Sequence, residues 1–530
     1  MFESRPCLRF AGDPFAKRMG TVFTEILADM AMKVDDGSGA WPKGMMHTST
    51  TPFTKPNYYD QMWSRDAGRG LYELARYGLK EEAESVCDYV LANRVHGDHW
   101  GRIINCDAGE AELDGNTHLL MGIYRTWLLG GRKETTARRY MEKCADVFAW
   151  FRRSMDECPV GELIPCASEL SGRPETADYA IFPNYGAWIA MQAFEDLCAA
   201  SGMNDYANQL HEDSNRLYRA MVSTFTRDGM WRNGLRQDGT PADVGHFCET
   251  DFDIRYWTRQ LPFIQKGDLT LHPAYLPEEE SRHAASYREI LCRMAQHPYF
   301  RKYGFVSCTC WAGIGPRHDD AMAGYGQNYM TQAALLMEDV NVYGKCLEGI
   351  SRLAYDGNVV RRLSFDANPW VMGECFSYAR YESGEDHTYA TDDNPGDEGN
   401  LVQSAETLKS LALTLGLEGT RDGVVFAPRL PWEWDEAECL NMPVIRNGER
   451  INICLEMRHE RWRRESRVRL HADKAMGRLR VRFGPFPAVM PGRAELERIY
   501  GAHNVVTKGN ATWIWMEADA DTKWEHVMRY

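Results

Sequence analysis

Residues 63–78 read Trp-Ser-Arg-Asp-Ala-Gly-Arg-Gly-Leu-Tyr-Glu-Leu-Ala-Arg-Tyr-Gly, which predicts a helix with a distinctive first turn. Trp63, Arg65 and Asp66 stand together at its start, and one face of the following helix is apolar. An indole ring packs on the C–H face of a sugar ring, and a guanidinium beside a carboxylate offers donors and acceptors to neighbouring hydroxyls. The alternative is an ordinary cap, in which Ser64 bonds the free amides and Asp66 complements the helix dipole.

The helices that the apolar periodicity predicts come in pairs with very short turns between them. The predicted helices are 15–33, 66–78, 80–95, 116–130, 133–155, 183–201, 203–226, 250–262, 283–296, 320–338, 341–356 and 400–416. Turns at 77–80, 129–132, 200–203 and 338–341 are short enough to make antiparallel hairpins.

Long connections, rich in Trp, His, Asp and Glu, follow these hairpins. They span 96–115, 156–182, 227–249, 297–319 and 357–399. Loops of this length are uncommon inside a compact domain unless they carry function. The alternation predicts a mainly α fold in which helical hairpins close into a ring, with the long loops gathered at one end.

After Gly416 the pattern changes to short stretches with strand-like alternation, punctuated by prolines. These stretches are 424–428, 450–457, 466–470, 479–483 and 512–515. We therefore expect two domains, a helical toroid over residues 1–418 and a small β-rich module over residues 419–530.

The composition excludes several classes of function. A net charge of −15 argues against a nucleic-acid partner. No apolar run is long enough for a membrane span, and no secretory signal is recognisable at the N-terminus. The 15 cysteines lie mostly in apolar helical contexts, typical of reduced thiols in a cytoplasmic protein. Cys308 and Cys310 lack a second pair at ligand spacing, so we expect no metal and no other cofactor.

Four stretches combine carboxylates with aromatic residues at the predicted loop-rich end. Besides residues 63–66, they contain Asp114, the pair Glu169 and Glu175, and Glu374 close to Trp370. Asp114 has an alternative role as the cap of the helix that follows it. His246 and Trp311 are further candidates for lining a cleft, since each stands in a long connection.

Together these features resemble the six-hairpin glycosidases, most nearly the glucoamylase family and its rhamnosidase-type relatives. The resemblance covers roughly residues 15–435 and implies an (α/α)6 toroid of six helical hairpins. Trp63-Ser64-Arg65-Asp66 matches the W-x-R-D element that holds the sugar in the −1 subsite. Glu112-Leu113-Asp114-Gly115 is similar to a second element but has Glu where the family has an amide, so the hydroxyl contact there is in doubt.

The resemblance also implies the catalytic pair. The family's general acid is a Glu preceding an aromatic-rich inner helix, a position that Glu169 and Glu175 both suit, and its general base is similar to Glu374. In an inverting enzyme the two carboxyl groups lie roughly 6.5–9.5 Å apart, so that a water fits between them. We therefore expect an exo-acting, inverting glycoside hydrolase with a small oligosaccharide or glycoside as its substrate.

Three other functions are compatible with the residues. A polysaccharide lyase would use Tyr185 or His246 as its base, with Asn184 or Arg255 neutralising a uronate. A sugar isomerase or epimerase would use His246 with His318. A carbohydrate-binding protein without catalysis is the third alternative.

Overall fold

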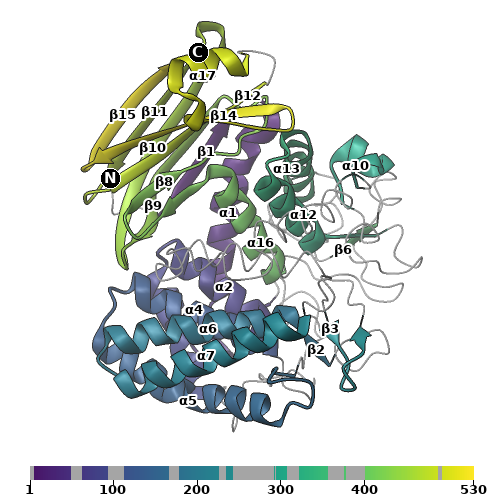
Figure 1. Cartoon of the computed structure of the whole chain (residues 1–530), viewed down its shortest axis with the longest axis vertical. Coiled ribbons are helices and arrows are strands. Elements are labelled where there is room, and N and C mark those ends of the chain that lie inside the picture. Colours follow the sequence, from purple (N-terminus) through teal and green to yellow (C-terminus); the bar gives the residue numbers. More distant parts are fainter. Residues whose placement is uncertain are drawn as a thin grey trace. The chain divides into compact units, whose positions relative to one another are not determined.

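The computed structural model of the 530-residue chain describes residues 5–48, 62–93, 113–165, 178–225, 234–242, 292, 294–306, 321–355, 375–377, 400–487 and 492–530. They belong to two compact units (Figure 1). One unit is Met30–His283, and the other combines Met1–Asp29 with Ala284–Tyr530. The domain boundary at residue 418 and the closed six-hairpin ring stay predictions.

The described residues of the unit Met30–His283 form three helical hairpins and a small sheet. Its elements are α2 (Ser64–Arg76), α3 (Lys80–Asn93), α4 (Leu113–Leu129), α5 (Glu134–Glu157), α6 (Ile181–Ala200), α7 (Asn204–Phe225), β2 (Tyr179–Ala180), β3 (Gly234–Leu235) and β4 (Pro241–Ala242). The predicted turns between α2 and α3, α4 and α5, and α6 and α7 are confirmed. Gly78 and Gly202 end α2 and α6 with φ of 77° and 70°, which glycine adopts without strain.

Helices in this unit alternate between buried and half-exposed. Every residue of α2 from Asp66 to Arg76 is buried, and so is every described side chain of α4. By contrast, α5 buries one stripe at helical spacing, including Tyr140, Cys144 and Phe151, and exposes the rest. Helices buried on all sides belong to an inner layer, and amphipathic ones cover it. Thus α2, α4 and α6 are inner helices, and α3, α5 and α7 are outer helices.

Glycines bring α2 and α4 into backbone contact. A Cβ atom added to Gly68 would lie 2.4 Å from the carbonyl carbon of His118, and one added to Gly122 would lie 3.1 Å from the carbonyl oxygen of Gly68. Any larger residue would separate the two helices. This crossing therefore depends on the absence of side chains at two positions.

The second unit contains α1 up to Asp29, several further helices and a β-sandwich. The helices are α1 (Pro14–Met32), α10 (Pro298–Tyr303), α12 (Gly324–Met337), α13 (Val340–Tyr355), α16 (Leu401–Leu415) and α17 (Arg493–Tyr500), with 3-10 turns η6 (Arg461–Arg463) and η7 (Ala502–Asn504). A short ladder joins β5 (Ala321–Ala323) to β6 (Cys375–Ser377). The predicted α12–α13 hairpin is confirmed.

Helix α16 is buried over its whole length although it carries polar residues. Glu406 accepts a hydrogen bond from Gln332 of α12 at 2.8 Å and pairs with Lys409 at 2.7 Å. Asn328 of α12 bonds Thr407 and Ser410, each at 3.0 Å. Because these buried groups are satisfied by one another, they specify how α12 and α16 pack.

The predicted β-rich module is a sandwich of two five-stranded sheets. One sheet has the order β1 (Cys7–Ala11), β9 (Glu436–Arg446), β10 (Glu449–Glu460), β11 (Glu465–Ala472), β15 (Lys523–Arg529). The other has the order β13 (Val505–Lys508), β14 (Ala511–Ala520), β12 (Gly477–Pro487), β8 (Gly423–Phe426), β7 (Leu417–Gly419). The sheets face each other, since the Phe483 ring lies 5.8 Å from His526 and the His459 ring lies 6.1 Å from Phe486.

A buried ionic cluster ties the turn between α12 and α13 to the sandwich. Glu338 pairs with Arg482 of β12 and, at 3.3 Å, with Lys508 of β13. Burial alone would raise the pKa of Glu338, but the charges of Arg482, Arg429 and Lys508 lower it to about 2. A carboxylate whose pKa is depressed on folding stabilises the fold above its unfolded pKa and loses that contribution as the pH falls.

We predict that Glu338→Gln lowers the free energy of unfolding by about 3 kcal/mol at pH 7, from the depressed pKa and the uncompensated Arg482. At pH 3.5 the difference in free energy of unfolding between variant and wild type should be about 1 kcal/mol smaller than at pH 7. The reason is that the carboxylate of Glu338 contributes less stability to the wild type at the lower pH. Urea unfolding at both pH values measures this. Exposed Glu212 provides the control variant Glu212→Gln. An equal difference at both pH values would contradict the assignment.

Candidate active site

The first turns of α2 and α4 lie side by side. A Cβ atom on Gly115 would lie 2.0 Å from Oγ of Ser64, so the two helices touch at their starts. Further along, the guanidinium of Arg125 lies 5.4 Å from the ring centre of Tyr72. Contacts that advance along both helices in the same direction mean that α2 and α4 run parallel.

Helices α4 and α6 are also parallel. A Cβ atom on Gly186 would lie 2.8 Å from Oγ1 of Thr117, and Tyr124 donates a 2.8 Å hydrogen bond to Asp196 further along. The N-termini of α2, α4 and α6 therefore gather at one end of the unit, which we call the α2/α4/α6 end. Each helix N-terminus carries partial positive charge and suits carboxylates and hydroxyl oxygens.

Three predicted sugar-binding residues lie at this end. Trp63 is the N-cap residue of α2 and is half-buried, with φ −87° and ψ 134°. Arg65 is half-buried in the first turn, and Asp66 is buried beside it at 6% exposure. The three residues therefore stand within the first turn of one inner helix, and their convergence on a sugar stays a prediction.

Two capping interpretations are wrong. Ser64 is the first residue inside α2 rather than its cap, and the N-cap Trp63 makes no side-chain cap bond. Ser64 instead faces Gly115 of α4. Asp114 lies within the first turn of α4, which begins at Leu113, so it does not precede the helix as a cap. Both errors arise because the helices begin earlier than apolar periodicity indicates.

A set of buried polar residues at this end was not predicted. Asn116, Thr117 and His118 follow one another at the start of α4, and each is at most 1% exposed. A run of three polar residues opening an otherwise apolar inner helix was the available signal. Burying polar groups costs stability, and proteins retain such groups mainly where they serve a function.

Asn184, in the first turn of α6, holds both ends of a neighbouring loop. Its Oδ1 accepts from Ile164 N at 2.8 Å, while its Nδ2 donates to Ile164 O at 2.9 Å and to Ala180 O at 2.8 Å. The backbone N–H of Asp178 donates a 2.9 Å hydrogen bond to the carbonyl oxygen of Leu235. Ile164 and Ala180, which come before and after residues 166–177 in the sequence, are therefore both held at the first turn of α6.

The remaining predicted site residues lie outside the described residues. They are Glu169, Glu175, His246, Trp311, Trp370 and Glu374. Within the described ranges, no group of three or more His, Cys, Asp or Glu is arranged to hold a metal ion. None of the helices in the described part of the chain combines the length and apolarity that crossing a bilayer requires.

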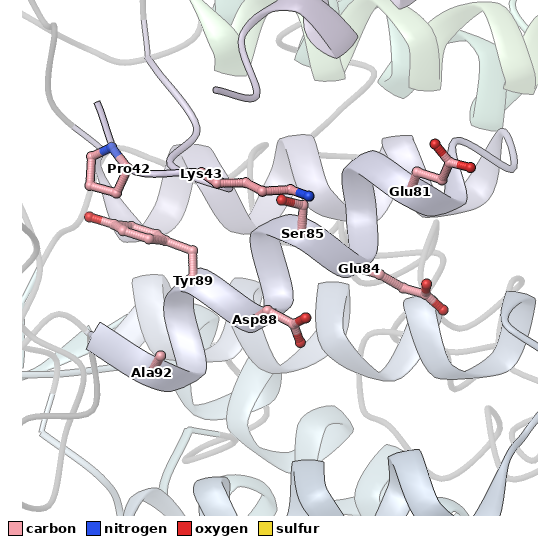
Figure 2. A pocket seen from close by; sticks show the side chains of 8 residues that line it. All are labelled: Pro42, Lys43, Glu81, Glu84, Ser85, Asp88, Tyr89 and Ala92. Carbon is pink, nitrogen blue, oxygen red and sulfur yellow. The ribbon is translucent and has the colours of Figure 1, made fainter. Parts of the chain in front are cut away.

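Outer helix α3 lines a separate hollow of about 580 Å³ (Figure 2). Figure 2 shows carboxylates of Glu81, Glu84 and Asp88 along one side of the helix, with Lys43 extended across it. Asp88 is engaged by Arg139 at 2.8 Å. Among the described residues, none of Trp63, Arg65 and Asp66 lines this hollow, so we treat it apart from the candidate site.

Comparison with known proteins identifies relatives by structure only. No protein-family model matches the chain, and no curated protein sequence matches it. Among solved structures, a GH78 family rhamnosidase of Bacillus sp. GL1 is similar with a TM-score of 0.51 and 13% identity, over 87% of this chain and 41% of that one. The α-L-rhamnosidase from Dictyoglumus thermophilum is similar with a TM-score of 0.52 and 7% identity, over 100% of this chain and 50% of that one.

A third structure, the α-L-rhamnosidase from Aspergillus terreus, has a TM-score of 0.52 and 10% identity, over 100% of this chain and 50% of that one. The chain spans half or less of the length of these three enzymes. At this identity the likeness shows the fold. The predicted resemblance to rhamnosidase-type glycosidases is confirmed at that level, since these structural neighbours are glycoside hydrolases.

Proposed function

We propose that this protein is a glycoside hydrolase that binds a terminal sugar at the α2/α4/α6 end. The observation that carries the proposal is the grouping of Trp63, Arg65 and Asp66 at the start of an inner helix whose neighbours begin at the same place. The indole supplies a flat apolar face, Arg65 supplies paired donors, and Asp66 accepts hydroxyl hydrogen bonds. The fold shared with rhamnosidases supports the same class of substrate.

Catalysis in this proposal needs one protonated and one ionised carboxyl group. We assign the general acid to Glu175 or Glu169 and the general base, which activates water, to Glu374. Support for the acid comes from Asn184 of α6, whose side chain binds Ile164 and Ala180, the residues on either side of the stretch of sequence that contains both candidates. Exo action and inversion are part of the proposal, as are sugar contacts by Asp114, His246, Trp311 and Trp370.

A screen of chromogenic glycosides, rhamnosides among them, tests the activity. On any substrate cleaved, Asp66→Asn should lower kcat/KM by roughly 100-fold, because charge-assisted hydrogen bonds to the sugar become neutral ones. Asp205→Asn is the matched control, since Asp205 stands in the first turn of outer helix α7 and is exposed. No cleavage of any glycoside, or equal loss in both variants, would refute the assignment.

The lyase alternative is disfavoured by one observation. The side-chain amide of Asn184 is fully engaged by Ile164 and Ala180, so it is not available to neutralise a uronate. Ultraviolet absorbance of an unsaturated product on incubation with uronate-containing glycans would reverse this conclusion. An unchanged product mass would instead favour an isomerase.

A further inference from the structure

A hollow of about 200 Å³ lies at one end of the β-sandwich, where β10, β12 and β15 end. Besides two prolines, it is lined by Trp432, His459, Arg461, Arg464, Phe486 and Tyr530. All of these residues belong to the unit that contains the sandwich. The lining combines aromatic rings, guanidinium groups and an imidazole, which together form a recognition surface for a small polar ring.

His459 is a buried side chain in the lining of the hollow. It is 8% exposed, and its Nδ1 lies 2.6 Å from Oγ of Ser466. Nε2 makes no hydrogen bond with acceptable geometry, although the backbone of Gly484 lies close enough to favour the protonated ring slightly. Burial and the nearby Arg461 lower the pKa of His459 to about 3, so the imidazole is neutral at physiological pH.

The hollow also carries positive charge that the described residues do not neutralise. Arg461 pairs with Asp435 at 3.1 Å, whereas Arg464 has no carboxylate within 4 Å in the part of the chain that the structure describes. The two acidic residues nearest in sequence are already engaged, Glu460 by Arg463 at 3.0 Å and Glu465 by Arg529 at 2.8 Å. The guanidinium of Arg464 therefore suits an anionic group on the ligand.

Aromatic rings supply the apolar side of the hollow. The half-buried ring of Tyr530 packs against Phe486 with 4.4 Å between the ring centres, which holds it in place. Trp432 is half-buried as well, and its Nε1 donates to Asn341 at 2.9 Å, which orients the indole. Because these rings are already held in place, they can contact the C–H groups of a ligand with little further loss of side-chain entropy.

We propose that this hollow is an accessory site for a single sugar unit that carries a carboxylate. The aromatic rings contact the sugar face, and Arg464 binds the carboxylate. A volume of about 200 Å³ corresponds to roughly six or seven waters, which suits one pyranose ring rather than a chain. The site is separate from the α2/α4/α6 end and does not depend on the proposed hydrolysis.

Calorimetric titration of the full chain with D-glucuronate, D-glucose and acetate tests this site. The background variant Asp66→Asn weakens binding at the α2/α4/α6 end. We expect D-glucuronate to bind at least tenfold more tightly than D-glucose or acetate. D-Glucose lacks the carboxylate that would bind Arg464, and acetate lacks the sugar ring that would contact the aromatic side chains. Equal affinity for acetate would show a simple anion site, and equal affinity for glucose a neutral-sugar site; either result overturns the proposal.

Two pairs of variants assign the binding to this hollow. Arg464→Gln should weaken D-glucuronate binding about tenfold or more, and Arg463→Gln should not, because Arg463 is equally exposed but lies outside the lining. Tyr530→Ala should weaken binding while Tyr530→Phe retains most of it. Arg464→Gln should leave glycoside hydrolysis unchanged. Identical binding in the Arg464 and Arg463 variants would refute the site, whether or not the protein proves to be a hydrolase.

Discussion

Glu374→Gln is expected to lower kcat for glycoside hydrolysis by about 10³-fold, on any substrate that the wild type cleaves. An amide cannot take a proton from the attacking water, and general acid–base catalysis typically contributes 10²–10⁴-fold. Of Glu175→Gln and Glu169→Gln, one should show a loss of similar size and the other a small one. Steady-state kinetics of the three variants measures this.

The leaving group separates the two roles. Loss of the general acid matters less when the departing group is already a weak base, so the acid variant should recover most of its kcat on a nitrophenyl or fluoride glycoside. The base variant should not recover. Glu212→Gln, on the exposed side of α7, serves as the control. Full activity in all three variants would show that the catalytic carboxylates are other residues.

Gly68→Ala is expected to cost about 3 kcal/mol of stability and most of the activity. The added methyl group would lie 2.4 Å from the backbone of His118 and 2.5 Å from that of Leu119, where no rotamer change can relieve the clash. Overpacking of a core typically costs 1–3 kcal/mol, and a clash with backbone belongs at the upper end. Chemical denaturation measures the first effect, and kcat/KM of the folded fraction measures the second.

Gly344→Ala is the control, because Gly344 also lies inside a helix but its added Cβ would meet only Pro431 at 3.4 Å. That variant should be neutral or slightly stabilised, since alanine favours helix more than glycine does. If the two variants had equal stability, α2 and α4 would not be in the close contact described.

The helical part of the fold was largely predictable from the sequence. Apolar spacing predicted eight of the described helices to within about two residues at most ends, and short turns predicted their pairing. The starts of α4 and α12 were less predictable, since these helices begin at Leu113 and Gly324 rather than at residues 116 and 320. The sequence indicated Trp63, Arg65 and Asp66 but not the buried polar start of α4.

The sandwich was predicted less completely. Strand β9 contains Pro443, which breaks local strand patterns, yet Pro443 lies opposite Asn452 in the ladder with β10. Strand β1 was missed because its partner lies at the far end of the chain, with Leu8 opposite Cys439. Pairings over such distances leave no local signal.

The pairing of β1 with β9 has a consequence for biosynthesis. Met30–His283 forms a unit from contiguous residues, whereas its companion unit needs Cys7–Ala11 and Glu436–Leu440 at the same time. At roughly 5–20 residues per second, the ribosome releases the second segment tens of seconds after the first. During that interval β1 has no strand to pair with. The inserted unit can therefore fold on the ribosome first, and the sheet that contains β1 is completed only after Glu436–Leu440 has emerged.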